Sequence, residues 1–204
     1  MELDEALARI SEIRRQMAQT ATFRGYRALT TALSGGSALL AAWLQSWLAP
    51  APMHQLQGYL AIWVGAAAIN VLAFTIELAV RYRRTESTLQ REMTLLAAGQ
   101  FVPALLAGAF LAVVIVQTAP AVAWMLPGLW SILFGLGIFA SRRLLPAPVF
   151  YLGAFYVLAG LVVLGRAQGA YALHPLAMGL TFGLGQFLNA AVLYWTLERR
   201  HAEA

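Results

Sequence analysis

Apolar residues in this chain gather in six long runs separated by short polar segments. The runs cover residues 23–49, 58–80, 94–117, 123–140, 148–165 and 175–197. Runs of about 20 apolar residues match the length that an α-helix needs to cross the roughly 30 Å hydrocarbon layer of a bilayer. The pattern therefore predicts an all-α polytopic membrane protein, with a six-helix transmembrane bundle over residues 22–198.

The first 21 residues follow a different pattern, because polar and charged positions alternate there with apolar ones. An apolar stripe at helical spacing contains Leu3, Leu7, Ile10, Ile13 and Met17. Such a stripe predicts an amphipathic helix over residues 1–21 at the cytoplasmic membrane interface. It either lies on the membrane surface or docks a cytoplasmic protein partner through residues 2–19. Residues 199–204 are expected to form a short cytoplasmic tail.

The basic residues indicate the orientation of the spans. The chain has 14 basic residues, all of them arginine, and every one except Arg166 falls on one side of the predicted topology. Arginine-rich loops stay in the cytoplasm, so both termini are expected there and the number of spans is even. The net charge of +5 is spread over span ends rather than gathered in one patch, which argues against nucleic-acid binding.

Composition narrows the chemistry that the chain can perform. It is 60% hydrophobic and 11% charged, with a mean hydropathy of +0.68, and it has no cysteine. Thiol catalysis and thiolate metal sites are therefore excluded. His54 and His174 have no third ligand of the usual kind near them, and no membrane-depth base accompanies the serines of the spans. We expect no metal, no cofactor and no enzymatic activity.

Glu77 is the one carboxylate inside any predicted span. Helical spacing places it on one face with Trp63, Asn70 and Arg81. An ionisable group within a span is costly and is by default a functional candidate. Two interpretations stay open: a structural ion pair between Glu77 and Arg81, or a ligand, proton or gating role.

Amides and glycines supply the remaining candidates. Gln100, Gln186 and Asn189 either bond across helices or line a polar cavity together with Asn70. Small residues within spans allow helices to approach closely, and on this ground four glycines are assigned to helix packing: Gly35, Gly36, Gly179 and Gly183.

Three landmarks recur in the two halves of the chain. Pro50-Ala51-Pro52 matches Pro146-Ala147-Pro148, and Gly58-Tyr59-Leu60 matches Phe150-Tyr151-Leu152. Gly99-Gln100-Phe101 matches Gly185-Gln186-Phe187. With three spans in each half, the second half would be inverted relative to the first, which is a recurrent plan among transporters.

Four further segments carry a resemblance to a known family. They are residues 23–27 (FRGYR), 125–130 (MLPGLW), 136–142 (LGIFASR) and 194–199 (YWTLER). Together they resemble a family of uncharacterised bacterial six-span membrane proteins, and the resemblance covers nearly the whole chain. Members are often encoded beside small winged-helix transcription regulators, so the resemblance implies a sensory or regulatory protein of the bacterial inner membrane. The family supplies no catalytic residues.

The leading hypothesis is a non-enzymatic membrane protein that binds a small or lipid-like ligand, or a partner, in a sensory or regulatory role. The ligand would lie near Asn70, Gln100 and Gln186, and the protein would contact the lipid bilayer and form a homo-oligomer. The alternative is a small transporter or channel built from the inverted repeat, with Glu77 as its coupling or gating carboxylate.

Overall fold

A computed structural model of the chain describes residues 28–84, 88–142 and 147–198. Its principal helices are α2 (Ala28–Leu48), α3 (Leu56–Arg84), α4 (Thr88–Thr118), α5 (Leu126–Ala140), α6 (Val149–Arg166) and α7 (Pro175–Leu193). Shorter helical turns occur at η1 (Pro120–Met125), η3 (Gly169–Tyr171) and the π-helical η4 (Tyr194–Glu198). The predicted N-terminal helix and C-terminal tail lie outside the described residues.

The described part of the chain is all-helical and contains no strand, which confirms the all-α prediction. Five helical segments in it are long and apolar enough to cross a membrane. They begin at Leu56, Gly99, Pro120, Val149 and Pro175. Helix α2 has 21 residues but is not among these five, because polar side chains interrupt its sequence. The structure therefore supports several membrane-length helices, and the predicted count of six is taken up below as a proposal.

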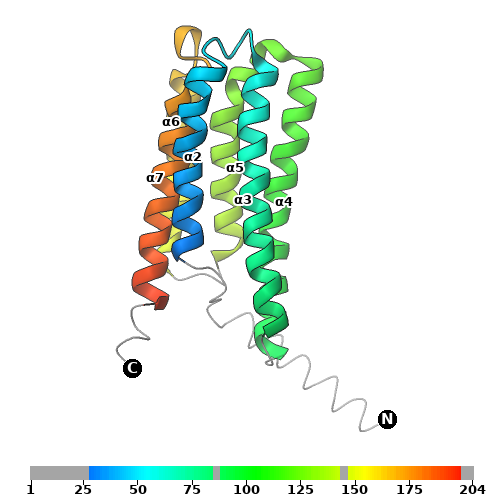
Figure 1. Ribbon diagram of the computed structural model, residues 1–204, viewed down its shortest axis with the longest axis vertical. Helices are drawn as coiled ribbons and strands as arrows, with labels where there is room; N and C mark the ends of the chain where they lie inside the picture. Colours follow the sequence, from blue (N-terminus) through cyan, green and yellow to red (C-terminus); the bar gives the residue numbers. More distant parts are fainter. Residues whose placement is uncertain (1–27, 85–87, 143–146, 199–204) are drawn as a thin grey trace.

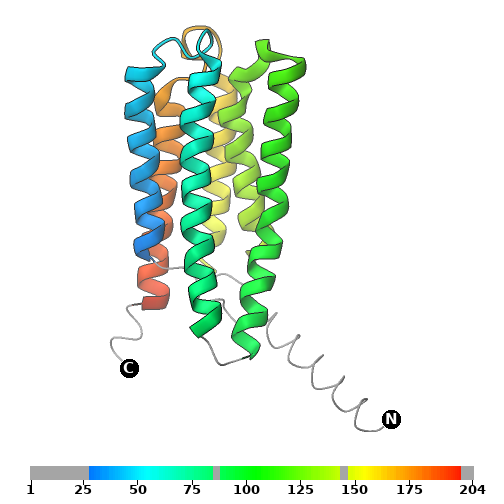
Figure 2. The same ribbon diagram turned by 45° about the vertical axis from the view of Figure 1, so that its right-hand side comes forward.

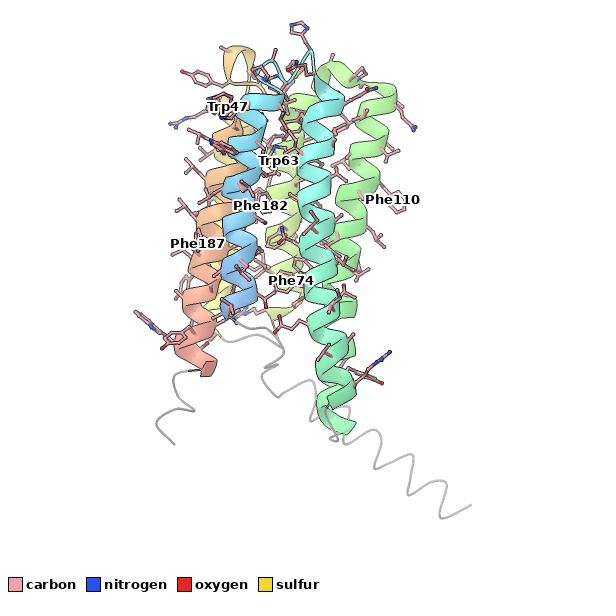
Figure 3. All side chains as sticks on the ribbon, in the orientation of Figure 1. Trp47, Trp63, Phe74, Phe110, Phe182 and Phe187 are labelled. Atoms are coloured by element: carbon pink, nitrogen blue, oxygen red, sulfur yellow. The ribbon has the colours of Figure 1, made fainter. Side chains whose placement is uncertain are left out.

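The polar side chains of α2 point into the bundle. Thr31, Ser34 and Gln45 are 1%, 5% and 0% exposed, whereas Leu29 and Trp47 on the same helix are 67% and 73% exposed. The other helices also carry large apolar side chains on their outer faces, and Trp47 and Phe110 project outward in Figure 3. In water this arrangement would be unstable, but it suits a lipid environment.

The principal helices run side by side along the long axis (Figure 1). Each contacts the next in the chain, and α7 returns to pack against α2. The most extensive contacts join α2 to α7 and α5 to α6, whereas α3 touches α4 at few positions. Ala28, Ala190 and Leu193 belong to one core cluster, so α2 begins where α7 ends. In Figure 2, α3 lies in front of the other helices and α4 lies at the right-hand edge of the bundle.

Helices α5 and α6 approach one another through two pairs of glycines. A Cβ built on Gly160 would lie 2.7 Å from the Gly128 carbonyl oxygen, and one built on Gly135 would lie 2.8 Å from that of Gly153. Each helix spaces its two glycines by seven residues, which returns them to nearly the same face. Only residues without side chains permit this backbone approach. The seven-residue spacing is visible in the sequence, but only the structure pairs these glycines across α5 and α6.

Three of the four glycines that the sequence assigned to packing lie where α2 meets α7. A Cβ on Gly179 would lie 2.6 Å from Ala42 Cβ, and one on Gly183 would lie 2.8 Å from Leu39 Cδ2. A Cβ on Gly35 would lie 3.1 Å from the Gly183 carbonyl oxygen. Gly36 differs, since an added Cβ there would meet no atom within 4 Å. The helix turns by about 100° between Gly35 and Gly36, so only Gly35 faces α7.

Gln45 joins α2, α3 and the segment before α7 by hydrogen bonds. The Trp63 indole nitrogen donates to Gln45 Oε1 at 2.7 Å, and Gln45 Nε2 donates to the Leu173 carbonyl oxygen at 2.7 Å. Gln45 and Leu173 are both fully buried, and Leu173 has a positive φ of 54°. A leucine in this backbone region is strained, so the hydrogen bond and burial help to hold the turn.

We expect Gln45→Leu to lower the free energy of unfolding by about 1–3 kcal/mol. The variant leaves the Trp63 indole N–H and the Leu173 carbonyl buried without the partner that each has now. Denaturant-induced unfolding in bicelles measures the loss. The exposed Gln168 supplies the matched control, because Gln168→Leu breaks no bond of this kind and should change stability little. Equal effects of the two substitutions would contradict the structural role of Gln45.

Candidate ligand-binding cavity

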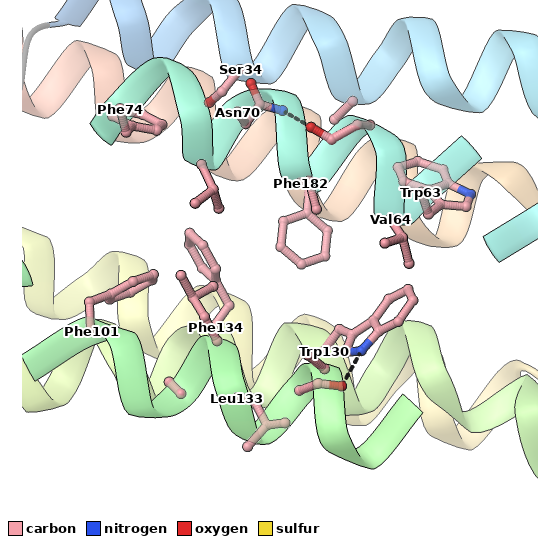
Figure 4. Close-up of a pocket in the computed structure, with 18 of the residues that line it drawn as sticks. Ser34, Trp63, Val64, Asn70, Phe74, Phe101, Trp130, Leu133, Phe134 and Phe182 are labelled. Carbon is pink, nitrogen blue, oxygen red and sulfur yellow. Dashed lines mark hydrogen bonds between the residues drawn. The ribbon is translucent and has the colours of Figure 1, made fainter. Parts of the chain in front are cut away.

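A cavity of about 700 Å³ lies between α2, α3, α4, α5 and α7, and Val149 at the start of α6 also lines it. Its lining is mostly apolar and includes Leu60, Val64, Ala67, Leu105 and Leu133. Six aromatic side chains also contribute: Trp63, Phe74, Phe101, Trp130, Phe134 and Phe182. Figure 4 shows Phe134 and Phe182 between α3 on one side and α4 and α5 on the other. Cavities of this volume and character hold small organic ligands.

The wall beside α5 and α7 is an aromatic cluster centred on Phe134. Its ring centroid lies 5.0 Å from that of Phe101, 4.7 Å from that of Tyr156 and 5.5 Å from that of Phe182. The contacts with Phe101 and Phe182 are edge-on, a favourable arrangement for ring quadrupoles. Because these rings come from four helices, the wall is held by packing rather than by one flexible side chain.

The polar edges of the two cavity tryptophans are bonded to protein. The Trp130 indole nitrogen donates to the Gly108 carbonyl oxygen at 3.0 Å, as Figure 4 shows. Trp63 donates to Gln45, and its side chain is only 4% exposed. Because its N–H is bonded to protein, the half-buried Trp130 can present apolar ring surface to a ligand, whereas Trp63 is almost wholly covered by protein and contributes a small area to the wall.

Asn70 bridges α3 and α2 from the cavity wall. Its Nδ2 donates to Ser37 Oγ at 2.7 Å and to the Ala66 carbonyl oxygen at 2.9 Å. Ser37 in turn donates to the Ser34 carbonyl oxygen at 2.8 Å. Both hydrogens of the Asn70 amide are therefore engaged within the protein. Asn70 thus combines the two predicted roles, since it bonds across helices and also lines the cavity.

The cavity brings together four of the residues that the sequence singled out: Trp63, Asn70, Gln186 and Asn189. Gln186 is 8% exposed. In the described part of the chain, no hydrogen bond reaches the Gln186 or Asn189 side-chain amide. Of the predicted amides that line the cavity, Asn70 alone makes a hydrogen bond to another helix in the described part of the chain.

Glu77 and Gln100 do not line the cavity. Neighbouring Phe74, Thr75 and Leu78 do line it, and the Glu77 side chain is half-buried with both carboxylate oxygens shielded from solvent. The structure describes the backbone of Arg81 but not its side chain, so the ion pair between Arg81 and Glu77 stays a prediction. Gln100 is also half-buried. Its Oε1 is shielded from solvent and accepts no hydrogen bond from the described residues.

The landmarks of the predicted inverted repeat face different surroundings in the two halves. Phe101 lines the cavity in one Gly-Gln-Phe segment and Gln186 lines it in the other. Tyr59 is fully buried, whereas Tyr151 is 74% exposed. Residues that are equivalent in a repeat should face equivalent surroundings. These landmarks therefore give the repeat little support.

Sequence reasoning missed much of the cavity wall, including Phe134, Phe182 and Leu133. Aromatic and aliphatic residues occur on every face of a membrane helix, so no local pattern separates those that line a cavity from those that face lipid. In Figure 3, Phe182 lies among the helices, whereas Phe187, five residues later on the same helix, projects outward.

Within the described residues, no group of three side chains of the metal-ligating kind comes together. Comparisons with protein-family models, with curated proteins and with solved structures find no match to this chain. The resemblance of four segments to a six-span bacterial family accordingly stays a prediction.

Proposed function

We propose that this chain is a non-enzymatic membrane protein that binds a small molecule or lipid with a hydrocarbon portion in the cavity between α2, α3, α4, α5 and α7. It spans a bacterial inner membrane six times, with both termini in the cytoplasm. The inward polar side chains and outward leucines of α2 support the sixth span. The placement of all arginines except Arg166 supports the orientation.

The observation that carries this proposal is the size and apolar lining of the cavity. The walls of this cavity, over about 700 Å³, present aromatic and aliphatic side chains that make favourable dispersion contacts with a hydrocarbon chain. Water would gain few hydrogen bonds from aromatic and aliphatic walls. A hydrocarbon-bearing ligand satisfies both conditions.

Fluorescence quenching tests the proposal, because Trp63 and Trp130 line the cavity. Phenylalanine replaces the other tryptophans, at positions 43, 47, 124 and 195. In vesicles, added 1-bromododecane should quench the two remaining indoles with a saturating dependence on its concentration in the membrane. The heavy bromine quenches only indoles that it contacts, so saturation reports occupancy of a defined site.

A companion variant that retains only Trp43 and Trp47 serves as the control. These side chains are 58% and 73% exposed, so they report on the surrounding lipid. Their quenching should rise without saturating. If the Trp63 and Trp130 signal also rises without saturating, or is not quenched, the cavity does not hold hydrocarbon and the proposed function fails.

The transporter alternative receives less support. Its coupling residue would be Glu77, which does not line the cavity. We therefore expect Glu77→Gln to leave the affinity for 1-bromododecane unchanged within about twofold. The quenching assay measures this affinity. Loss of binding in a folded Glu77→Gln protein would mean that the Glu77 carboxylate contributes to the site. A proton-flux assay in liposomes would then test the transporter alternative.

The regulatory part of the proposal concerns residues 2–19 and rests on their amphipathic pattern. A cytoplasmic protein partner would bind that helix and respond to occupancy of the cavity. Deletion of residues 2–19 should leave 1-bromododecane binding intact, because the lining supplied by α2, α3, α4, α5 and α7 is retained. Loss of the folded bundle on deletion would make the helix structural.

Cross-linking of the full-length protein in vesicles tests the expected homo-oligomer.

A further inference from the structure

The lining of the cavity changes along its length. Thr31 and Ser34 come from the first turns of α2, Gln186 and Asn189 from the second half of α7, and Ser141 from the end of α5. Because neighbouring helices alternate in direction, these side chains belong to the same half of the bundle, here called the polar half. Apolar side chains line this half as well, among them Phe74, Phe101 and Ile138. The other half is lined by groups such as Leu60, Val64, Ala112, Val113 and Trp130, with Gln117 at its edge.

The polar half contains buried groups whose hydrogen-bonding capacity is unused. Ser141 is 4% exposed, and its hydroxyl has no hydrogen-bond partner among the described residues. Gln186 is 8% exposed and lines the same cavity, and within that part of the chain no hydrogen bond involves its side-chain amide. Buried polar groups are nearly always bonded, so these two are available to a ligand.

The described lining contains no charged side chain. It includes amides and hydroxyls but no arginine, aspartate, glutamate or histidine. A charged group brought into such surroundings would lose its hydration without gaining a counter-ion. Hydroxyls and amides can instead satisfy an uncharged polar group by ordinary hydrogen bonds.

The cavity reaches the outer surface between α3 and α4. Val64 and Val71 on α3 and Val102 and Val113 on α4 line the cavity, yet they are 50%, 44%, 45% and 51% exposed. The two helices also touch at few positions. In a membrane this surface faces acyl chains, so a hydrophobic molecule can pass between α3 and α4 without crossing water.

We propose that the cavity takes a single-chain amphiphile with an uncharged, hydroxyl-bearing polar group. The molecule enters sideways from the bilayer between α3 and α4. Its polar group bonds to Gln186 and Ser141, and its chain lies along Trp130 and Trp63. This inference rests on the proposed function, since it names the ligand class of the same cavity.

Three probes with the same dibrominated octadecyl chain test the ligand class in the protein that retains only Trp63 and Trp130. They are the monoacylglycerol, the long-chain alcohol and the ionised carboxylate, compared at equal concentration in the membrane. We expect the two uncharged probes to half-saturate quenching at about tenfold lower concentration than the carboxylate. The glyceride and the alcohol share one chemistry, and the tighter of the two indicates whether a membrane glyceride or a free alcohol is the better ligand.

Substitutions at the polar end test the placement of the polar group. Ser141→Ala and Gln186→Leu should each raise the half-saturating concentration of the alcohol about fivefold and reduce its advantage over the carboxylate. Gln100→Leu is the matched control, because Gln100 is a membrane amide that does not line the cavity. Ser141→Ala removes only a hydroxyl without a partner, so that variant should fold even if Gln186→Leu does not.

The outcomes separate this inference from the proposed function. Saturating quenching by 1-bromododecane together with equal binding of all three probes, or tighter binding of the carboxylate, would overturn the inference and leave the proposed function standing. Unchanged binding by both polar-end variants would also overturn it. Absence of saturating quenching by every probe would remove the proposed function as well.

Loading kinetics test the lateral route. The double variant Val71→Phe/Val102→Phe narrows the passage from both sides, and quenching after mixing with vesicles that carry the brominated alcohol should slow about tenfold. The matched control is Val80→Phe/Val114→Phe, since these valines are 42% and 54% exposed but do not line the cavity. An unchanged loading rate in the first variant would overturn entry between α3 and α4.

Discussion

Gly160→Ala is expected to lower the free energy of unfolding by about 1–3 kcal/mol. The new methyl group would lie 2.7 Å from the Gly128 carbonyl oxygen and 2.7 Å from Ile132 Cγ1. A backbone oxygen cannot turn away as the end of a flexible side chain can, so α5 and α6 must separate. Separation weakens one of the two most extensive helix contacts in the bundle.

Unfolding in mixed micelles or bicelles measures this loss, with retained helix content as the readout. Gly36→Ala and Gly65→Ala are matched controls in the same bundle, because a Cβ at either position meets no atom within 4 Å. They should change stability by no more than about 0.5 kcal/mol. Equal destabilisation by all three substitutions would mean that the loss at Gly160 does not come from the contact between α5 and α6.

Ala67→Phe/Ala109→Phe is expected to weaken binding of 1-bromododecane by about tenfold or more, which corresponds to about 1.4 kcal/mol. Both alanines line the cavity, one from α3 and the other from α4. Two phenyl rings in this space take up volume that hydrocarbon would otherwise occupy. Because both alanines are exposed rather than packed in the core, the bundle has room to fold around the larger residues.

The control for this variant is unusually close in sequence. Ala68 and Ala107 are also exposed alanines of α3 and α4, but they do not line the cavity. Ala68→Phe/Ala107→Phe adds the same volume to the lipid-facing surface and should leave the saturation curve unchanged. Binding that survives in the cavity variant, or falls equally in both variants, would place the bound hydrocarbon outside this cavity.

The helical class and several of the membrane-length helices were predictable from local pattern alone. In lipid no water is present to bond to the backbone, so each N–H and C=O group of a long apolar run must pair within the protein. An α-helix makes these hydrogen bonds within a single segment. The glycines at the contact between α2 and α7 were also accessible, because spacing by four residues places Gly179 and Gly183 on one face. Pattern alone did not distinguish Gly35 from Gly36, which needed the position of α7.

The sequence by itself thus determined which segments become long apolar helices, since that property depends on neighbours along the chain. The helix ends differ from the predicted runs, because α3 continues to Arg84 and α4 begins at Thr88. Only the tertiary structure decided which face of each helix turns inward. One residue corresponds to about 100° of rotation, so Leu78 lines the cavity and Glu77 does not. In the same way the pairing of five helices selected Phe134, Phe182 and Gln186 for one cavity. Apolar residues occur on both the lipid-facing and inward surfaces, so hydrophobicity carries no signal for this choice.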